Sequence, residues 1–218
     1  MSAAVLTISN KNYSSWSLRG WLLCKIAGLE IVEQMASVHD TSMRAELLLI
    51  SPSFLVPSLQ HQDIKIWDTL SIAEYLNEIR PESGLYPADR AARAHCRSIS
   101  GEMHAGFYNL RSALPMNLRS RHPGFKILAG AHADIVRIIE IWSACLRSYG
   151  GPYLFGASPT VADAMFAPVC TRFWSYDVRL DGAAAAYRDS ILAWPAVLEW
   201  SEDALAEQID LEELDVEF

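Results

Sequence analysis

The sequence predicts an α/β unit over residues 1–80 and an all-helical unit over residues 90–218, joined by a linker at 81–89. In the first unit, short apolar runs that suit strands alternate with stretches of helical periodicity. Pro81, Gly84 and Pro87 then interrupt both patterns. Beyond the linker, apolar residues recur at helical spacing. A chain of 218 residues is long enough for two domains of this size.

The N-terminal unit is expected to follow the order β-α-β-α-β-β-α. Its first helical pattern stops at Gly28, a residue type that commonly ends a helix. Asp68 or Thr69 is expected to cap its last helix, because either side chain can accept from the amides of a first turn. The expected elements are strand 5–9, helix 16–27, strand 31–35, helix 42–50, strands 58–60 and 64–67 as a hairpin, and a helix over 69–79.

The C-terminal unit shows two apolar stripes, which are expected to pack on each other, and two further helix starts. Thr160 and Asp163 form a capping-box pattern that opens a third helix. Pro195 stands at a permissive early position of a fourth, over 194–205. Residues 210–218 are acidic and are expected to be exposed. The stripes consist of Met103, Phe107, Leu110 and Leu114, and of Ile135, Ile138, Ile139, Trp142 and Leu146.

Composition and charge limit the classes of function. Hydrophobic residues make up 51% of the chain and charged residues 20%, which is typical of a globular protein. The 18 basic and 26 acidic residues give a formal net charge of -8, and this field disfavours nucleic acid and anionic membranes as partners. The chain shows no signal-peptide pattern and no run of about 18 apolar residues, so a cytoplasmic protein is expected.

Neither a metal site nor a dithiol motif is expected. The four cysteines form no C-x-x-C pair, and the six histidines include no H-E-x-x-H spacing. Widely separated cysteines in such a chain are expected to be buried and reduced. They are Cys24, Cys96, Cys145 and Cys170.

The loop at residues 10–17 is the strongest candidate for chemistry. It contains Ser14 and Ser15 immediately before a helix. Helix N-terminal amides and the positive end of the helix dipole favour a bound anion such as a thiolate, to which a serine hydroxyl can donate. The alternative is that the two serines only cap the helix.

Two further segments could complete a ligand site. A cis bond between Val56 and Pro57, at the entry to a strand, would turn backbone groups outward to pair with an extended peptide. The alternative there is an ordinary trans proline. Asp68 could pair with an amine while the hydroxyl of Thr69 and nearby helix amides bind a carboxylate, and the alternative is simple capping.

Taken in order, these segments resemble the glutathione S-transferase superfamily over nearly the whole chain. The matching stretches are residues 14–19, 51–59, 68–76 and 160–163. The first of them resembles the motif of serine-type, zeta-like members. The resemblance implies an α/β thioredoxin-like N-terminal domain, an all-α C-terminal domain and glutathione as the co-substrate.

The resemblance also implies roles for individual residues. Ser14, with Ser15 beside it, would donate a hydrogen bond to the glutathione sulfur and lower the pKa of the thiol. Thr160 and Asp163 would only cap their helix. Val56 would bind glutathione through its backbone, and Asp68 with Thr69 would bind the γ-glutamyl end. The full set of residues implied to bind glutathione is Trp16, Val56, Pro57, Asp68 and Thr69.

The pocket for the second substrate is expected on the first helix of the C-terminal domain. His104, Tyr108 and Arg111 are spaced i, i+4 and i+7, so they would share one helix face. The alternative is a solvated or interfacial face.

At the first motif, Trp16 stands where zeta-like members commonly have cysteine and Leu18 where they have tryptophan, which disfavours maleylacetoacetate isomerisation.

The function expected from the resemblance is a cytoplasmic, homodimeric glutathione transferase acting in detoxification. It would activate the thiol of glutathione for attack on a small electrophile. The alternatives are a glutathione-dependent isomerase or peroxidase, and a noncatalytic transferase-like interaction module, because one fold hosts many functions.

Overall fold

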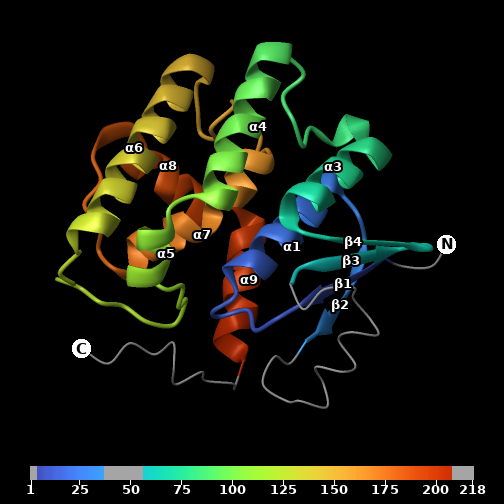
Figure 1. Ribbon diagram of the computed structural model, residues 1–218, viewed down its shortest axis with the longest axis horizontal. Coiled ribbons are helices and arrows are strands. Elements are labelled where there is room, and N and C mark those ends of the chain that lie inside the picture. The colour runs from blue at the N-terminus through green and yellow to red at the C-terminus, as the bar shows by residue number, and fades with distance from the viewer. Residues whose placement is uncertain (1–3, 37–55, 208–218) are drawn as a thin grey trace.

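The computed structural model describes residues 4–36 and 56–207. A sheet with its helices, built from the N-terminal residues, packs against a group of helices built from residues beyond 89 (Figure 1). The expected helix at 42–50, the stretch 51–55 and the acidic tail at 210–218 lie outside the described residues. The domain boundaries stay a prediction.

The described strands form a mixed four-stranded sheet in the order β2-β1-β3-β4. The central strand β1 runs parallel to β2 and antiparallel to β3, and β3 and β4 form the expected hairpin. All four expected strands are confirmed to within one residue at their ends. They are β1 (Ala4–Ile8), β2 (Ile31–Met35), β3 (Ser58–His61) and β4 (Ile64–Trp67).

Helices α1 (Ser15–Ala27) and α3 (Thr69–Ile79) pack beside each other and against the sheet (Figure 1). Ser14 is the N-cap of α1, and Gly28 ends this helix with φ 62°, a left-handed conformation that suits glycine. Asp68 is the N-cap of α3, as one of the two expected alternatives. Both helices therefore begin at polar residues of the candidate site.

Beyond residue 89, helix α7 forms the centre of the packing. Nearly all of its residues are buried, and it contacts α1, α4 and α8. The capping box is confirmed, because the Asp163 carboxylate accepts from the Thr160 amide at 2.8 Å. The helices of this part are α4 (Arg90–Ala105), α5 (Tyr108–Ala113), α6 (Ala129–Tyr149), α7 (Val161–Ser175), α8 (Gly182–Leu192) and α9 (Pro195–Ala206), with a short 3-10 turn, η1 (Pro81–Ser83), before them.

The prediction that the apolar stripe over 103–114 lies on a single helix is wrong, although the four residues of the stripe are all buried. α4 ends before Gly106, and Phe107 has φ 58°, so the chain turns there before α5 begins. The carboxylate of Asp134 in α6 accepts from the amide of Leu110 at 2.8 Å. This contact from a distant helix satisfies a first-turn amide of α5, which makes the break affordable.

The four cysteines are free and buried, as expected. Burial raises the pKa of Cys24 to about 12, so this thiol stays protonated and unreactive. Over residues 4–36 and 56–207, no group of three or more His, Cys, Asp or Glu is placed to hold a metal ion. Nor does this part of the chain contain a helix long and apolar enough to span a membrane.

Asn12 fixes the loop that leads into α1. Its side chain is fully buried, and its Oδ1 accepts from the amides of Leu118 at 2.8 Å and Arg119 at 3.1 Å. Its Nδ2 donates to Asn117 Oδ1 at 3.0 Å. The helical part of the chain therefore holds the loop through one buried amide group.

Lys11 ties the same loop to α9. Its ammonium lies 2.6 Å from carboxylate oxygens of both Glu33 and Asp203, and its carbonyl accepts from the indole of Trp200 at 3.0 Å. Burial alone would lower the pKa of Lys11, but the two carboxylates outweigh burial and raise it. The ammonium therefore stays charged and paired in the folded protein.

Gly20 lets α1 approach the proline of the candidate site. A Cβ atom at this position would lie 2.4 Å from Pro57 Cγ. Gly101, also helical, has open space where its Cβ would be. We expect Gly20→Ala to lower the free energy of unfolding by about 1–3 kcal/mol through overpacking, whereas Gly101→Ala raises it by up to about 1 kcal/mol. Urea denaturation measures both, and a neutral Gly20→Ala would contradict the contact.

Removing the Asn12 amide should loosen the loop. Asn12→Ala leaves the Leu118 amide without its side-chain acceptor and removes the donor to Asn117 Oδ1, whereas the Arg119 amide keeps Asn117 Oδ1 at 3.1 Å, so we expect the free energy of unfolding to fall by about 1–3 kcal/mol. Asn109→Ala, at an exposed position of α5, serves as the control and should change it by less than about 0.5 kcal/mol. Equal effects in urea denaturation would show that Asn12 does not hold the loop.

Candidate functional site

A cavity of about 220 Å³ lies at the N-terminal ends of α1 and α3. It brings together all five residues that the sequence suggested for glutathione binding and adds one from α4. The Val56–Pro57 peptide bond in its wall is cis, as predicted. The lining residues are Trp16, Val56, Pro57, Asp68, Thr69 and His104.

Asp68 uses both carboxylate oxygens within the protein. Oδ1 accepts from the amides of Leu70 at 2.9 Å and Ser71 at 3.2 Å, and Oδ2 pairs with Nε2 of His104. The first-turn amides of α3 thus already bind a carboxylate, which is that of Asp68. Asp68 also has φ 75°, a backbone conformation that costs about 1–3 kcal/mol and is concentrated at functional sites.

Thr69 presents a buried hydroxyl that no described group satisfies. Its Oγ1 has no hydrogen-bond partner among residues 4–36 and 56–207, although the residue is only 1% exposed and lines the cavity. A buried hydroxyl without a partner costs about 1–3 kcal/mol. A ligand with a polar group at this end of the cavity would remove that cost.

Ser14 and Ser15 differ in accessibility and in hydrogen bonding. Ser14 is half-buried; its Oγ donates to Ser17 Oγ at 2.8 Å and accepts from the Ser17 amide at 3.3 Å. Ser15 is buried, and its Oγ accepts from a guanidinium nitrogen of Arg19 at 3.3 Å. Ser14 is therefore the less buried of the two serines, although neither is among the residues that line the cavity, and it also caps α1 as the alternative interpretation stated.

Trp16 joins the cavity to a group of cations. Its ring lies 5.1 Å from the ring of His104, and the guanidinium carbons of Arg19 and Arg111 lie 4.6 Å and 5.6 Å from its centre. Arg111 is half-buried. The indole therefore lies close both to His104, the partner of Asp68, and to the two arginines.

The prediction that His104, Tyr108 and Arg111 share one helix face is wrong. His104 belongs to α4, whereas the other two belong to α5, because the chain turns at Phe107. His104 and Arg111 still meet at the Trp16 ring, but Tyr108 is 73% exposed.

Two buried arginines beside the site were missed by sequence reasoning. Arg19 is fully buried; its Nε donates to the carbonyl of Met165 at 2.8 Å, and its Nη2 has no partner in the described part of the chain. Arg172, 4% exposed, donates from Nε to the carbonyl of Leu114 at 2.9 Å, and no described residue pairs with its Nη1. The available signal for Arg19 was its spacing, because a residue three positions after Trp16 in an apolar helix lies on the same helix face.

Burial and mutual repulsion weaken the proton affinity of both buried guanidiniums. Burial first, then the charges of Arg172 and Arg111, lower the pKa of Arg19 well below its usual range. Burial and then Arg111 lower the pKa of Arg172 to about 10. With a pKa of about 10, Arg172 stays protonated at neutral pH.

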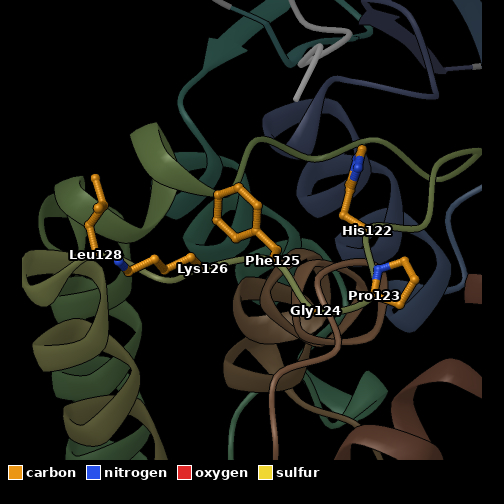
Figure 2. Close-up of a pocket in the computed structure, with 6 residues that line it drawn as sticks. All are labelled: His122, Pro123, Gly124, Phe125, Lys126 and Leu128. Atoms are coloured by element: carbon orange, nitrogen blue, oxygen red, sulfur yellow. The ribbon is translucent and has the colours of Figure 1, made fainter.

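A larger cavity of about 620 Å³ lies along the loop between α5 and α6. Figure 2 shows His122 and Pro123 at one end of the lining stretch, Lys126 and Leu128 at the other, and the ring of Phe125 between them. The described lining residues of this cavity include no carboxylate and no hydroxyl or thiol nucleophile.

Comparisons with known proteins agree with this geometry. Family models of the glutathione S-transferase N-terminal and C-terminal domains match residues 13–79 and 125–203. A probable maleylacetoacetate isomerase of Caenorhabditis elegans is 28% identical over 158 residues, 71% of this chain and 72% of that protein. Glutathione S-transferase 1 of Dianthus caryophyllus is 30% identical over 56% of each chain.

A solved structure gives the same fold. A glutathione transferase homologue from Burkholderia, crystallised with bound glutathione, superposes with a TM-score of 0.70 at 20% identity, covering 95% of this chain and 100% of that one. Two matching domain models in the expected order, together with this likeness, confirm the resemblance stated from the sequence. The chain belongs to the glutathione S-transferase superfamily.

Proposed function

We propose that this glutathione-dependent enzyme is a transferase, which activates the thiol of glutathione at Ser14 for attack on a small electrophile. The observation that carries the proposal is the cavity that unites Trp16, Val56 and Thr69 at the N-terminal ends of two helices. A relative of the family and the Burkholderia homologue are named for the same co-substrate. The helix dipole of α1 favours an anion at Ser14.

The cavity offers groups for the cysteinyl part and the γ-glutamyl end of the tripeptide. The backbone of Val56 would pair with the cysteinyl part, and the unpartnered hydroxyl of Thr69 would bind the γ-glutamyl carboxylate. Asp68 would hold the γ-glutamyl amine with the oxygen that it now shares with His104. Binding at this end therefore includes an exchange of partners at Asp68.

Ser14 would supply the hydrogen bond to the sulfur. Its hydroxyl can turn from Ser17 Oγ toward a thiolate while its oxygen continues to accept from the Ser17 amide. Ser17 Oγ keeps the amide of Ser9 as a partner at 2.9 Å. A donor aimed at the sulfur stabilises the thiolate, lowers its pKa and so increases the nucleophile at neutral pH.

Isomerisation is the second candidate, because the relative from Caenorhabditis elegans is a probable maleylacetoacetate isomerase. In isomerisation glutathione adds and leaves, and in peroxide reduction it is oxidised, so product analysis by mass spectrometry separates both from net conjugation. A noncatalytic module would show no glutathione binding in calorimetry at millimolar ligand. Two further implications of the family, a homodimer and a cytoplasmic location, stay predictions.

Ser14→Ala tests the thiol site. We expect kcat/KM for conjugation to fall about a hundredfold, because one donor to a developing or bound anion is lost. Loss of the α1 cap should lower stability by about 1 kcal/mol. Asp89→Ala, which removes the N-cap of α4, controls for capping and should leave kcat/KM unchanged. Unchanged turnover of Ser14→Ala on every accepted electrophile would remove Ser14 from catalysis.

Thr69→Val tests the unpartnered hydroxyl. The substitution keeps the shape and removes a group that has no partner, so stability should hold or rise, while the Kd for glutathione measured by calorimetry should rise about tenfold. Thr171→Val is the matched control, because Thr171 Oγ1 donates to the Pro168 carbonyl at 2.9 Å. It should lower stability without changing the Kd. An unchanged Kd for Thr69→Val would place glutathione elsewhere.

A further inference from the structure

Three guanidinium groups gather beside Ser15 and Trp16, and no described carboxylate pairs with them. Arg19 donates to Ser15 Oγ at 3.3 Å and lies against the Trp16 ring, and Arg111 lies against the same ring. Arg172 reaches the group from α7, close enough for its charge to act on Arg19. In the part of the chain that the structure describes, none of the three forms an ion pair.

Other arginines in the same protein are paired with carboxylates, unlike these three. Arg97 and Arg137, on the surface, each make two hydrogen bonds to one glutamate, Glu74 and Glu102. The chain also has more acidic than basic residues, 26 against 18. Carboxylates are therefore abundant, yet none of those described lies at the place where two arginines are buried.

Burying a cation without a counterion is expensive. The effective penalty is several kcal/mol for each ion, and the charges of the three groups repel one another. Backbone carbonyls satisfy Nε of Arg19 and Arg172, but one Nη atom of each is buried and finds no partner among the residues that the structure describes. A positive potential therefore remains beside Ser15, and an incoming anion would offset it.

We propose that the second substrate is an electrophile bearing a carboxylate, and that this carboxylate pairs with Arg111 in the potential of Arg19 and Arg172. The inference rests on the proposed function and names its substrate class. Arg111 is the member of the cluster that a ligand can reach, because it is half-buried whereas the other two are buried. A guanidinium matches the planar geometry of a carboxylate in two parallel hydrogen bonds.

Trp16 lies beside both proposed binding places. Its ring lines the cavity proposed for glutathione, and the guanidiniums of Arg19 and Arg111 lie within 4.6 Å and 5.6 Å of its centre. A carboxylate at Arg111 would hold the electrophilic end of the substrate toward Ser14 and Ser15. The arginines then determine which electrophile is accepted, whereas Ser14 activates the thiol.

Glutathione conjugates test the proposal without knowledge of the natural electrophile. S-(carboxybenzyl)glutathione and S-(carbamoylbenzyl)glutathione, each as meta and para isomers, differ in charge but hardly in shape. In calorimetry at neutral pH, we expect the wild-type protein to bind a carboxylate conjugate about tenfold more tightly than its amide. Arg111→Ala should abolish this preference, so that the carboxylate and amide conjugates bind with equal affinity, and Arg111→Lys should retain part of it.

Arg147→Ala, at an exposed position of α6 away from the cluster, is the matched control and should keep the full preference. Thermal melting checks that each variant is folded. Equal affinity of the wild-type protein for the charged and neutral conjugates would overturn the proposal, as would a preference that survives in Arg111→Ala. Binding of glutathione but of no conjugate would also overturn it. Absence of glutathione binding itself would instead contradict the proposed function.

Discussion

The site depends on the buried amide of Asn12, which joins the loop before α1 to residues more than 100 positions further along the chain. The loop has few apolar side chains to hold it, so its conformation is set by polar contacts with the helical part. These contacts place Ser14 at the start of α1, and α1 in turn carries Trp16 and Arg19. The chemistry of the N-terminal residues is thus held in position by the C-terminal ones.

Charge is distributed so that an acidic protein presents a positive site. The formal net charge is -8, yet the ends of α1 and α3 and the three arginines create a local potential of opposite sign. Low dielectric surroundings make this local potential stronger than the distant surface charges, which solvent screens. Glutathione and a carboxylate-bearing partner would both be anions, so such a potential is needed to bring two like charges together.

Elements with local signals were predicted from the sequence, and those determined by distant partners were not. Gly28 favours a helix end because glycine adopts a left-handed conformation, and Asp68 favours a helix start because its carboxylate caps amides. The strands follow from short apolar runs. Helix α8 was missed because its alanine-rich start shows no contrast between faces. The turn at Phe107 depends on Asp134 of another helix, and the buried state of Arg19 depends on α7. The periodicity of one segment does not predict contacts with a distant segment.

The contact between Lys11 and Asp203 spans 192 positions of the chain, which has a consequence for biosynthesis. The loop that this ion pair closes is 192 positions long, and contacts of such large separation form late because the entropy of closing the loop is lost first. Until the ribosome has synthesised α9, the loop before α1 lacks its partner on that helix. The N-terminal part can form its sheet earlier, but the loop that carries Ser14 becomes fully ordered only after α9 has been made.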